Sequence, residues 1–349
     1  MNIVKNQKES LKTVVLTSGL LVVLLVAFLL SLTLGSVSIP LGAVINSLVG
    51  RTLENEAWQT IVLQVRLPKS ITALLAGSAL SLCGLQMQTL FRNPLAGPYV
   101  LGINSGASLG VSLILLGFGG GLGLAGLGAF QYLTIVVAAF GGASLVLICI
   151  LLAAKIIENN TTLLIIGLMF GYLTSSVVSI LLYFSNSEEI QSFLLWSFGN
   201  FGSTSWDKLL FFIPVIGVGV TISLFTSKML NSLLLGLDYA RTMGLNVKRA
   251  RWLIILSTSL MAGTVTAFCG PIGFLGIAVP HLCRGLYKTT NHFVLVPAVA
   301  LMGAILAIGA GVFAELPGSA KTLPLNSVTA LIGAPIIIWI LLKGKGLKT

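Results

Sequence analysis

Long runs of residues without any charged side chain are the feature that most limits how this sequence can fold. Only 8% of the 349 residues are charged and 56% are apolar, whereas about a quarter of a soluble domain is charged. The pairs of charged residues that bound the runs are Lys12 and Arg51, Lys69 and Arg92, Arg92 and Lys155, Glu158 and Glu188, Lys208 and Lys228, Arg251 and Arg284, Lys288 and Glu315, and Lys321 and Lys343. Because a helix needs about 20 apolar residues to span a bilayer, the sequence excludes a water-soluble globule. It predicts a single all-α, polytopic membrane domain over residues 1–349.

Turn signals divide these runs into about ten candidate membrane-spanning helices. Glycines are dense over Gly117–Gly128, and Gly270–Gly273 contains a proline, so both segments interrupt stretches that are too long for one crossing. The predicted spans cover residues 13–34, 70–91, 98–118, 130–153, 162–184, 208–227, 252–270, 273–288, 293–314 and 324–342. We expect the third and eighth spans to be short, and we interpret residues 190–201 as a short half-helix.

Lysine and arginine residues predict the orientation of the spans. If both termini are cytoplasmic, 15 of the 20 basic residues lie on the cytoplasmic side, in agreement with the positive-inside rule. The five basic residues that then lie outside are Arg51, Arg66, Lys69, Lys208 and Lys321. A net charge of +11 would suit a nucleic-acid-binding protein, but the charges are confined to the loops between spans. The distribution therefore indicates a lipid bilayer as the partner and argues against nucleic acid.

The predicted spans lack the groups that would let the chain supply its own energy. No Asp or Glu lies inside a predicted span, and ion-coupled transporters hold such residues at membrane depth. A phosphate-binding Gly-x-x-x-x-Gly-Lys-Ser/Thr loop is missing from the sequence. The four cysteines lack metal-ligand spacing, so we expect neither a disulfide nor a metal site. We therefore predict that the chain is not an enzyme and that transport is either powered by a partner or passive.

The longest loop predicted on the cytoplasmic side, from Lys228 to Arg251, carries a candidate docking element. Asp238 is suited to the N-cap of a short helix, and Gly244 is suited to end that helix in the left-handed conformation. A short helix held at both ends is stiff enough to transmit a displacement from a partner. A connector that only caps the neighbouring spans would use the same residues, so these residues alone leave both interpretations open.

Several separate motifs resemble those of the FecCD-type permeases, which are membrane subunits of type II ATP-binding-cassette importers for iron chelates (siderophores), haem and cobalamin. The resemblance runs from about Arg66 to Lys343. In chain order the motifs are Arg66-Leu67-Pro68-Lys69, Gly84 to Gln88, Arg92-Asn93-Pro94-Leu95-Ala96-Gly97-Pro98, Gly270-Pro271-Ile272-Gly273, Pro280-His281 with Arg284, Leu323-Pro324-Leu325, and Thr329 to Pro335.

The resemblance implies a ten-helix, cobalamin-permease-like subunit in the cytoplasmic (inner) membrane of a bacterium. The implied partners are a second permease copy, two ATPase subunits that bind ATP and Mg, and an external solute-binding protein. No cofactor is expected on this chain. The loop over about residues 236–246 is similar to the family's coupling helix, which sits in a cleft of the ATPase. The coupling residues implied are Gly236, Asp238, Ala240, Arg241 and Gly244.

From the resemblance we predict that the chain moves an iron chelate or haem by alternating access, with energy from the separate ATPase. Cobalamin is the alternative cargo within the same architecture. The alternative from a different class is a facilitator or channel that works without a partner and has no need for the short cytoplasmic helix.

For the outer face, the resemblance assigns Arg66 and Lys69 to contacts with acidic residues of the binding protein. Interfacial snorkelling of these two long side chains is the alternative. Many relatives carry an arginine where this chain has Glu315. The resemblance therefore implies that one docking charge is reversed and that the partner offers a cation near Glu315.

Small residues recur every four positions along the fifth predicted span and form one weakly polar stripe. The stripe consists of Gly167, Gly171, Ser175 and Ser179, with Thr174 beside it. The family lines its translocation path with the fifth and tenth helices, and Gly333 and Pro335 would allow the tenth to bend. The resemblance therefore assigns Gly171, Thr174, Ser175, Ser179 and Gly333 to the path. Close packing of helices through small residues is the alternative.

Overall fold

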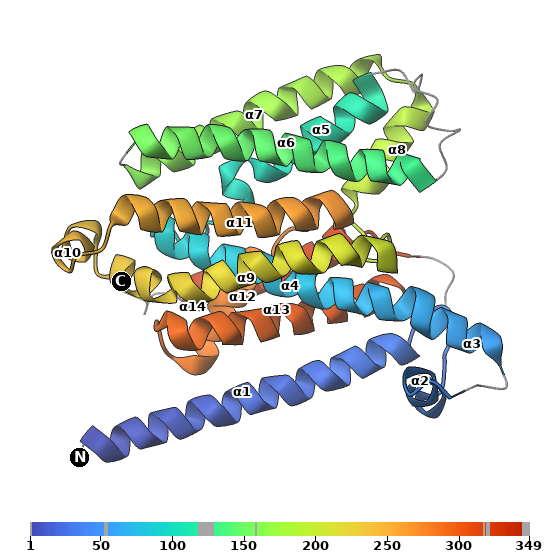
Figure 1. Cartoon of the computed structure of the whole chain (residues 1–349), viewed down its shortest axis with the longest axis horizontal. Helices are drawn as coiled ribbons and strands as arrows, with labels where there is room; N and C mark the ends of the chain where they lie inside the picture. Colours follow the sequence, from blue (N-terminus) through green and yellow to red (C-terminus); the bar gives the residue numbers. More distant parts are fainter. Residues whose placement is uncertain are drawn as a thin grey trace.

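The computed structural model describes residues 2–51, 55–117, 129–157, 159–316, 318 and 322–343, and all regular secondary structure in these residues is helical. The helices form one elongated bundle (Figure 1). They are α1 (Asn2–Thr33), α2 (Leu41–Leu48), α3 (Glu56–Thr60), the π-helical η1 (Ile61–Arg66), α4 (Leu67–Phe91), the 3₁₀ turn η2 (Pro98–Leu101), α5 (Ile103–Ser112), the π-helical η3 (Leu113–Gly117), α6 (Ala129–Ile156), α7 (Asn160–Phe184), α8 (Ser187–Ser197), α9 (Trp206–Leu234), α10 (Leu237–Thr242), α11 (Val247–Cys269), α12 (Leu275–Tyr287), α13 (His292–Ala314) and α14 (Leu325–Lys343).

Seven helical segments of the described chain are long and apolar enough to cross a membrane: α1, the continuous segment Glu56–Phe91, α6, α7, α9, α11 and α13. They correspond to seven of the predicted spans. The span predicted at 98–118 is divided at Gly102, whose φ of 72° ends η2, so the apolar helix covers only Ile103–Gly117. The span predicted at 273–288 is α12, with 13 residues, and the last is α14, with 19 residues. The number of crossings and the side of the termini stay predictions.

The half-helix predicted at 190–201 is confirmed as α8, an 11-residue helix that starts earlier than expected, at Ser187. A capping box sets this start. Asn186 Oδ1 accepts the Glu189 N–H at 3.0 Å, and Glu189 Oε2 accepts the Asn186 N–H at 3.2 Å. Most of the glycine-rich segment 117–128 and the loop residue Lys321 lie outside the described residues.

Helix α4 forms the centre of the bundle and is buried along most of its length. It packs against α13, α11, α12 and α9, which surround it in Figure 1. Small residues let these backbones approach closely. A Cβ added to Gly77 would lie 2.2 Å from the Gly303 carbonyl oxygen of α13, and one added to Gly84 would lie 1.6 Å from the Gly276 carbonyl oxygen of α12.

Gln86 joins three helices inside the apolar core. Its side chain is fully buried. Its Nε2 donates to Thr226 Oγ1 of α9 and to Ser257 Oγ of α11, both at 3.3 Å, and its Oε1 accepts from Thr258 Oγ1 at 2.8 Å. Because a buried polar group without a partner costs about 1–3 kcal/mol, this set of hydrogen bonds favours one mutual arrangement of α4, α9 and α11.

Apolar side chains cover the outside of the bundle. Only 6% of the most apolar window of α1 and 17% of that of α7 are buried, and Leu21, Tyr172 and Leu173 are exposed. A surface of this kind is unstable in water and is suited to lipid. The N-terminal end of α1 and the short helix α10 lie at one end of the bundle, whereas α2, α3 and α8 lie at the other (Figure 1).

Candidate coupling helix, docking residues and transport path

The short helix predicted in the 228–251 loop is present as α10, which covers Leu237–Thr242. Its exposed surface carries Asp238 and Arg241, whose side chains are 97% and 49% exposed and lie 3.7 Å apart (Oδ1 to Nη1). Ala240 on the opposite side is fully buried in a hydrophobic cluster. The helix therefore presents charged groups outward while one small side chain anchors it to the bundle.

The predicted N-cap of α10 is wrong by two residues. Gly236 holds that position, with φ 120° and ψ 152°, a conformation that is open to glycine because it has no Cβ. Asp238 lies instead in the first turn, where its carboxylate faces the positive end of the helix dipole. The helix starts early because Gly236 turns the chain sharply after α9.

The predicted role of Gly244 in ending α10 is confirmed. Its φ is 81°, and the Leu245 N–H donates to the Ala240 carbonyl while the Gly244 N–H donates to that of Arg241, each at 3.0 Å. These two bonds form a Schellman motif, which satisfies carbonyl groups at the helix end. The Gly244 backbone therefore holds the C-terminal end of α10 firmly.

Arg92 ends α4 in a left-handed conformation, with φ 49° and ψ 36°. The Asn93 N–H donates to the Gln88 carbonyl at 3.1 Å and the Arg92 N–H to that of Thr89 at 3.3 Å, which is again a Schellman motif. Glycine usually fills this position, and a residue with a Cβ costs about 1 kcal/mol more there. The Arg92 side chain reaches the last turn of α9, where Nη2 donates to the carbonyls of Leu233 at 3.2 Å and Leu234 at 3.3 Å.

The other residues of the central motifs gather around the same end of α4. Gln88 Oε1 accepts from Arg284 Nη1 of α12 at 2.6 Å, and Gln88 Nε2 donates to the Ile277 carbonyl at 3.2 Å. His281 Nε2 lies 2.7 Å from the Pro94 carbonyl. The side chain of Asn93 accepts the Leu95 N–H at 2.9 Å and shapes the loop.

Three further residues at this end, Thr89, Asn231 and His292, were missed by sequence reasoning. His292 Nε2 lies 2.8 Å from Thr89 Oγ1, and its Nδ1 lies 2.8 Å from Asn231 Oδ1 of α9. The signal was a polar residue at the start or end of an apolar run, as Thr89, Asn231 and His292 all are. Together these contacts tie α4 to α9, α12 and α13.

The segment from Gly270 to Phe274 connects α11 to α12 with no regular structure. Gly270, with φ 74°, approaches α8 so closely that a Cβ would lie 2.5 Å from the Trp196 carbonyl oxygen, and the Pro271 carbonyl oxygen lies 3.1 Å from the Cβ position of Gly199. The Ile272 N–H donates to Tyr99 Oη at 3.1 Å, and the Gly273 N–H to Asn326 Oδ1 at 3.0 Å. Side chains from distant helices therefore hold this break. Pro280 lies within α12 and is buried.

Arg66 is a buried residue, 6% exposed, in the segment that leads into α4. Its Nη1 donates to the carbonyls of Leu32 at 2.8 Å and Thr33 at 2.9 Å, and its Nη2 donates to that of Val37. The guanidinium group therefore closes the turn after α1. The structure shows that Arg66 forms its hydrogen bonds within the chain. Its predicted docking role stays a prediction.

Lys69 of α4 forms an ion pair with Glu315 at the end of α13, with side chains that are 17% and 30% exposed. The sequence predicts that Lys69 meets an acid, and Glu315 a cation, on a partner protein. The structure pairs the two with each other, and their docking role stays a prediction. The pairing was not visible in the sequence because 246 positions separate two residues that only the packing of α13 on α4 brings together.

One half of the small-residue stripe of α7 packs against neighbouring helices, and the other half is exposed. A Cβ at Gly102 would lie 2.8 Å from the Gly167 carbonyl oxygen, and one at Gly171 would lie 3.5 Å from Ser105 Oγ, so this half of the stripe packs against η2 and α5. Thr174 is buried, whereas Ser175 and Ser179 are exposed. The second half of the stripe faces out of the bundle, and the path role of all four α7 residues stays a prediction.

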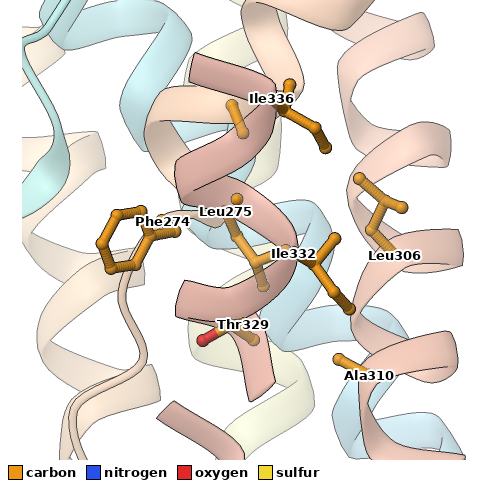
Figure 2. Close-up of a pocket in the computed structure, with 9 residues that line it drawn as sticks. Phe274, Leu275, Leu306, Ala310, Thr329, Ile332 and Ile336 are labelled. Atoms are coloured by element: carbon orange, nitrogen blue, oxygen red, sulfur yellow. The ribbon is translucent and has the colours of Figure 1, made fainter. Parts of the chain in front are cut away.

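Gly333 of α14 packs directly on Phe274, because a Cβ at Gly333 would lie 2.5 Å from the Phe274 Cβ. Phe274 has a φ of 66°, which is uncommon for an aromatic residue. Figure 2 shows the apolar hollow beside this contact, where Leu306, Ile332 and Ile336 come from α13 and α14. The hollow is small, with a cavity volume of ≈ 10 Å³.

Within the described residues, no group of three or more His, Cys, Asp or Glu side chains could hold a metal ion. All four cysteines are free thiols, and Cys83, Cys269 and Cys283 are buried. The arrangement thus consists of an apolar helical bundle, a short charged helix at one end and an ion pair near the other end of α4.

Comparisons with known proteins agree with this arrangement. A model of the FecCD transport family matches residues 23–343. The vitamin B12 import system permease protein BtuC of Klebsiella pneumoniae is 37% identical over 333 residues, which cover 94% of this chain and 93% of that protein. The BtuC protein of Salmonella typhi is 37% identical over 290 residues, with coverage of 82% and 84%.

A solved structure shares the fold. It shows an inward-facing conformation of a metal-chelate type ABC transporter and matches with a TM-score of 0.81 and 31% identity, covering 94% of this chain and 99% of that one. The fold and these likenesses define a multi-pass permease of an ATP-binding-cassette importer in the inner membrane. The chain belongs to the FecCD transport family.

Proposed function

We propose that this chain is the permease subunit through which a separate ATPase drives the uptake of a large metal chelate, by alternating access. The observation that carries the proposal is the geometry of α10. This helix is exposed and charged on its outer side, ends in a Schellman motif at Gly244, and lies at one tip of the bundle (Figure 1). Such an element is suited to sit in a cleft of a partner and to move as a rigid unit.

Two substitutions test this role. Gly244→Pro removes the N–H that ends α10, and Asp238→Lys reverses the outermost charge and places it beside Arg241. We expect both to abolish substrate-stimulated ATP hydrolysis in the reconstituted importer while the permease stays in the membrane. Asp207→Lys is the matched control, because Asp207 is an exposed acid at the start of α9. Unchanged stimulation in the first two variants would contradict the proposal.

The competing class is a facilitator that needs no ATPase. Purification of the tagged permease separates the two, since the proposed function predicts that an ATPase co-purifies with the wild-type chain and is lost with Gly244→Pro. Uptake down a concentration gradient by the permease alone in sealed vesicles, with no ATPase present, would favour the competing class.

For the cargo, we propose a chelate of iron, or haem, or the corrinoid cobalamin. The BtuC relatives, which are named for vitamin B12 import, support cobalamin, whereas the related structure of a metal-chelate type transporter supports a metal chelate more generally. Uptake of labelled cobalamin, ferric chelate and haem in a strain that lacks this chain distinguishes the three. We further propose two copies of the permease, two ATPase subunits with ATP and Mg, and an external solute-binding protein, which the native mass of the purified complex would test.

A further inference from the structure

Arg92 is a motif residue whose side chain reaches toward the coupling element. It ends α4 in the left-handed conformation, with φ 49°, where glycine would be unstrained. Strained backbone conformations cluster at functional sites, and at Arg92 the side-chain contacts indicate a role.

The guanidinium group of Arg92 holds the junction between α9 and α10. Its Nη2 donates to the carbonyls of Leu233 at 3.2 Å and Leu234 at 3.3 Å, and the Leu233 carbonyl also accepts the Gly236 N–H at 3.2 Å. A Cβ at Gly236, the N-cap of α10, would lie 3.3 Å from the same nitrogen. Arg92 thus contacts the turn from which α10 begins.

The last turn of α4 connects this junction to the rest of the bundle. Gln88 receives a hydrogen bond from Arg284 of α12 at 2.6 Å, and Thr89 lies 2.8 Å from His292 of α13. From there α4 runs through the core to its ion pair with α13 at Lys69. A displacement that enters α4 at Arg92 therefore meets a stiff, buried helix with partners on several sides.

We infer that Arg92 is a positioning residue that holds α10 in register with α4, so that movement of α10 reaches the centre of the bundle. This inference rests on the coupling role proposed for α10. The chain enters and leaves α10 through Gly236 and Gly244, with φ of 120° and 81°. The side chain of Arg92 adds a fixed link across the first of these glycine turns.

The test uses the complete complex of permease, ATPase and binding protein in liposomes, with labelled cobalamin, ferric chelate or haem, whichever the wild-type complex transports. Arg92→Gly removes the side chain and relieves the backbone strain. Arg92→Met keeps a long side chain and the strained backbone but cannot donate. The matched control is Lys288→Gly, because Lys288 is an exposed cation in the same left-handed position at the end of α12.

We expect the ATPase to co-purify with both Arg92 variants and the amount of cargo moved per ATP hydrolysed to fall about tenfold. Arg92→Gly should retain the wild-type Tm, and Lys288→Gly should retain wild-type cargo per ATP. Two results would overturn the inference: wild-type cargo per ATP in both Arg92 variants, or a parallel loss of ATPase and uptake with a lowered Tm, which is the mark of a purely structural role. If no ATPase accompanies the wild-type chain, the proposed function fails instead, and this result is distinct from both.

Discussion

The backbones of Gly84 in α4 and Gly276 in α12 are in direct contact, so that a Cβ at Gly84 would lie 1.6 Å from the Gly276 carbonyl oxygen. This contact holds the short helix α12 against the buried central helix and brings Arg284 to Gln88. It is the closest of several glycine contacts that let α4 pack against its neighbours.

We predict that Gly84→Ala destabilises the protein by about 3 kcal/mol, because the added methyl group meets the backbone of two packed helices that have no room to shift. The measurement is the Tm of the purified protein in detergent. Gly285→Ala in α12 is the control, since nothing lies within 4 Å of that Cβ position and alanine favours a helix over glycine by about 1 kcal/mol. Equal Tm values for the two variants would show that the contact is not as close as described.

The buried polar set around Gln86 makes a second prediction. Gln86→Leu should lower the free energy of unfolding by about 1–2 kcal/mol, because the hydroxyl groups of Thr226, Ser257 and Thr258 lose their amide partner. Gln191→Leu on the exposed face of α8 should change it little. The double variant with Gln86→Leu and Thr258→Val should lose less free energy of unfolding than the sum of the two single variants. Strict additivity would argue against the 2.8 Å hydrogen bond between these side chains.

The ion pair between Lys69 and Glu315 predicts that charge reversal destabilises the protein when it is made in one partner but not when it is made in both. Lys69→Glu and Glu315→Lys each place like charges together and should lower the Tm, whereas the double variant restores the pair with opposite polarity. The expected coupling free energy is about 1 kcal/mol for a pair that is partly exposed to solvent. Thermal unfolding of all four proteins measures it, and a coupling of zero would show that the two side chains act separately.

A fourth prediction concerns the contact of Gly333 with Phe274. Gly333→Ala should destabilise the protein by about 2 kcal/mol and reduce uptake, because α14 is pushed away from the break between α11 and α12. Adding Phe274→Gly removes the opposing side chain and the positive-φ strain, so it should recover part of the loss. Gly309→Ala in α13 has nothing within 4 Å of the added methyl group and should behave as wild type. If the second change gives no recovery, the two residues do not oppose each other.

The membrane-spanning helices were largely predictable because lipid acts on each segment separately. An apolar run of sufficient length must form a helix that satisfies its own backbone groups, so hydropathy alone located α1, α6, α7, α9 and α13. Gly244 was predictable for a similar reason, since a left-handed helix end selects glycine locally. The N-cap of α10 was predicted wrongly because the local sequence offers two residues suited to that position, Asp238 and Gly236.

The positions of the motif residues were not predictable in the same way. The docking role predicted for Arg66, Lys69 and Glu315 stays a prediction, and the sequence did not show that each also has a partner within the chain. Arg92, Gln88 and Arg284 were recognised only as a family pattern, and their convergence at the end of α4 appears once the helices are packed. The same is true of Phe274 and Gly333, which are far apart in the sequence and touch in the fold.

The sequence by itself determined that this chain is an all-helical membrane protein with a short charged helix near residue 240, because burial in lipid and the ends of helices depend on neighbouring residues. Only the tertiary structure decided which side chains meet, because contacts between helices depend on the distance at which their backbones pack. That distance is set jointly by small residues on two helices, such as Gly84 and Gly276, whose pairing no single stretch of sequence contains.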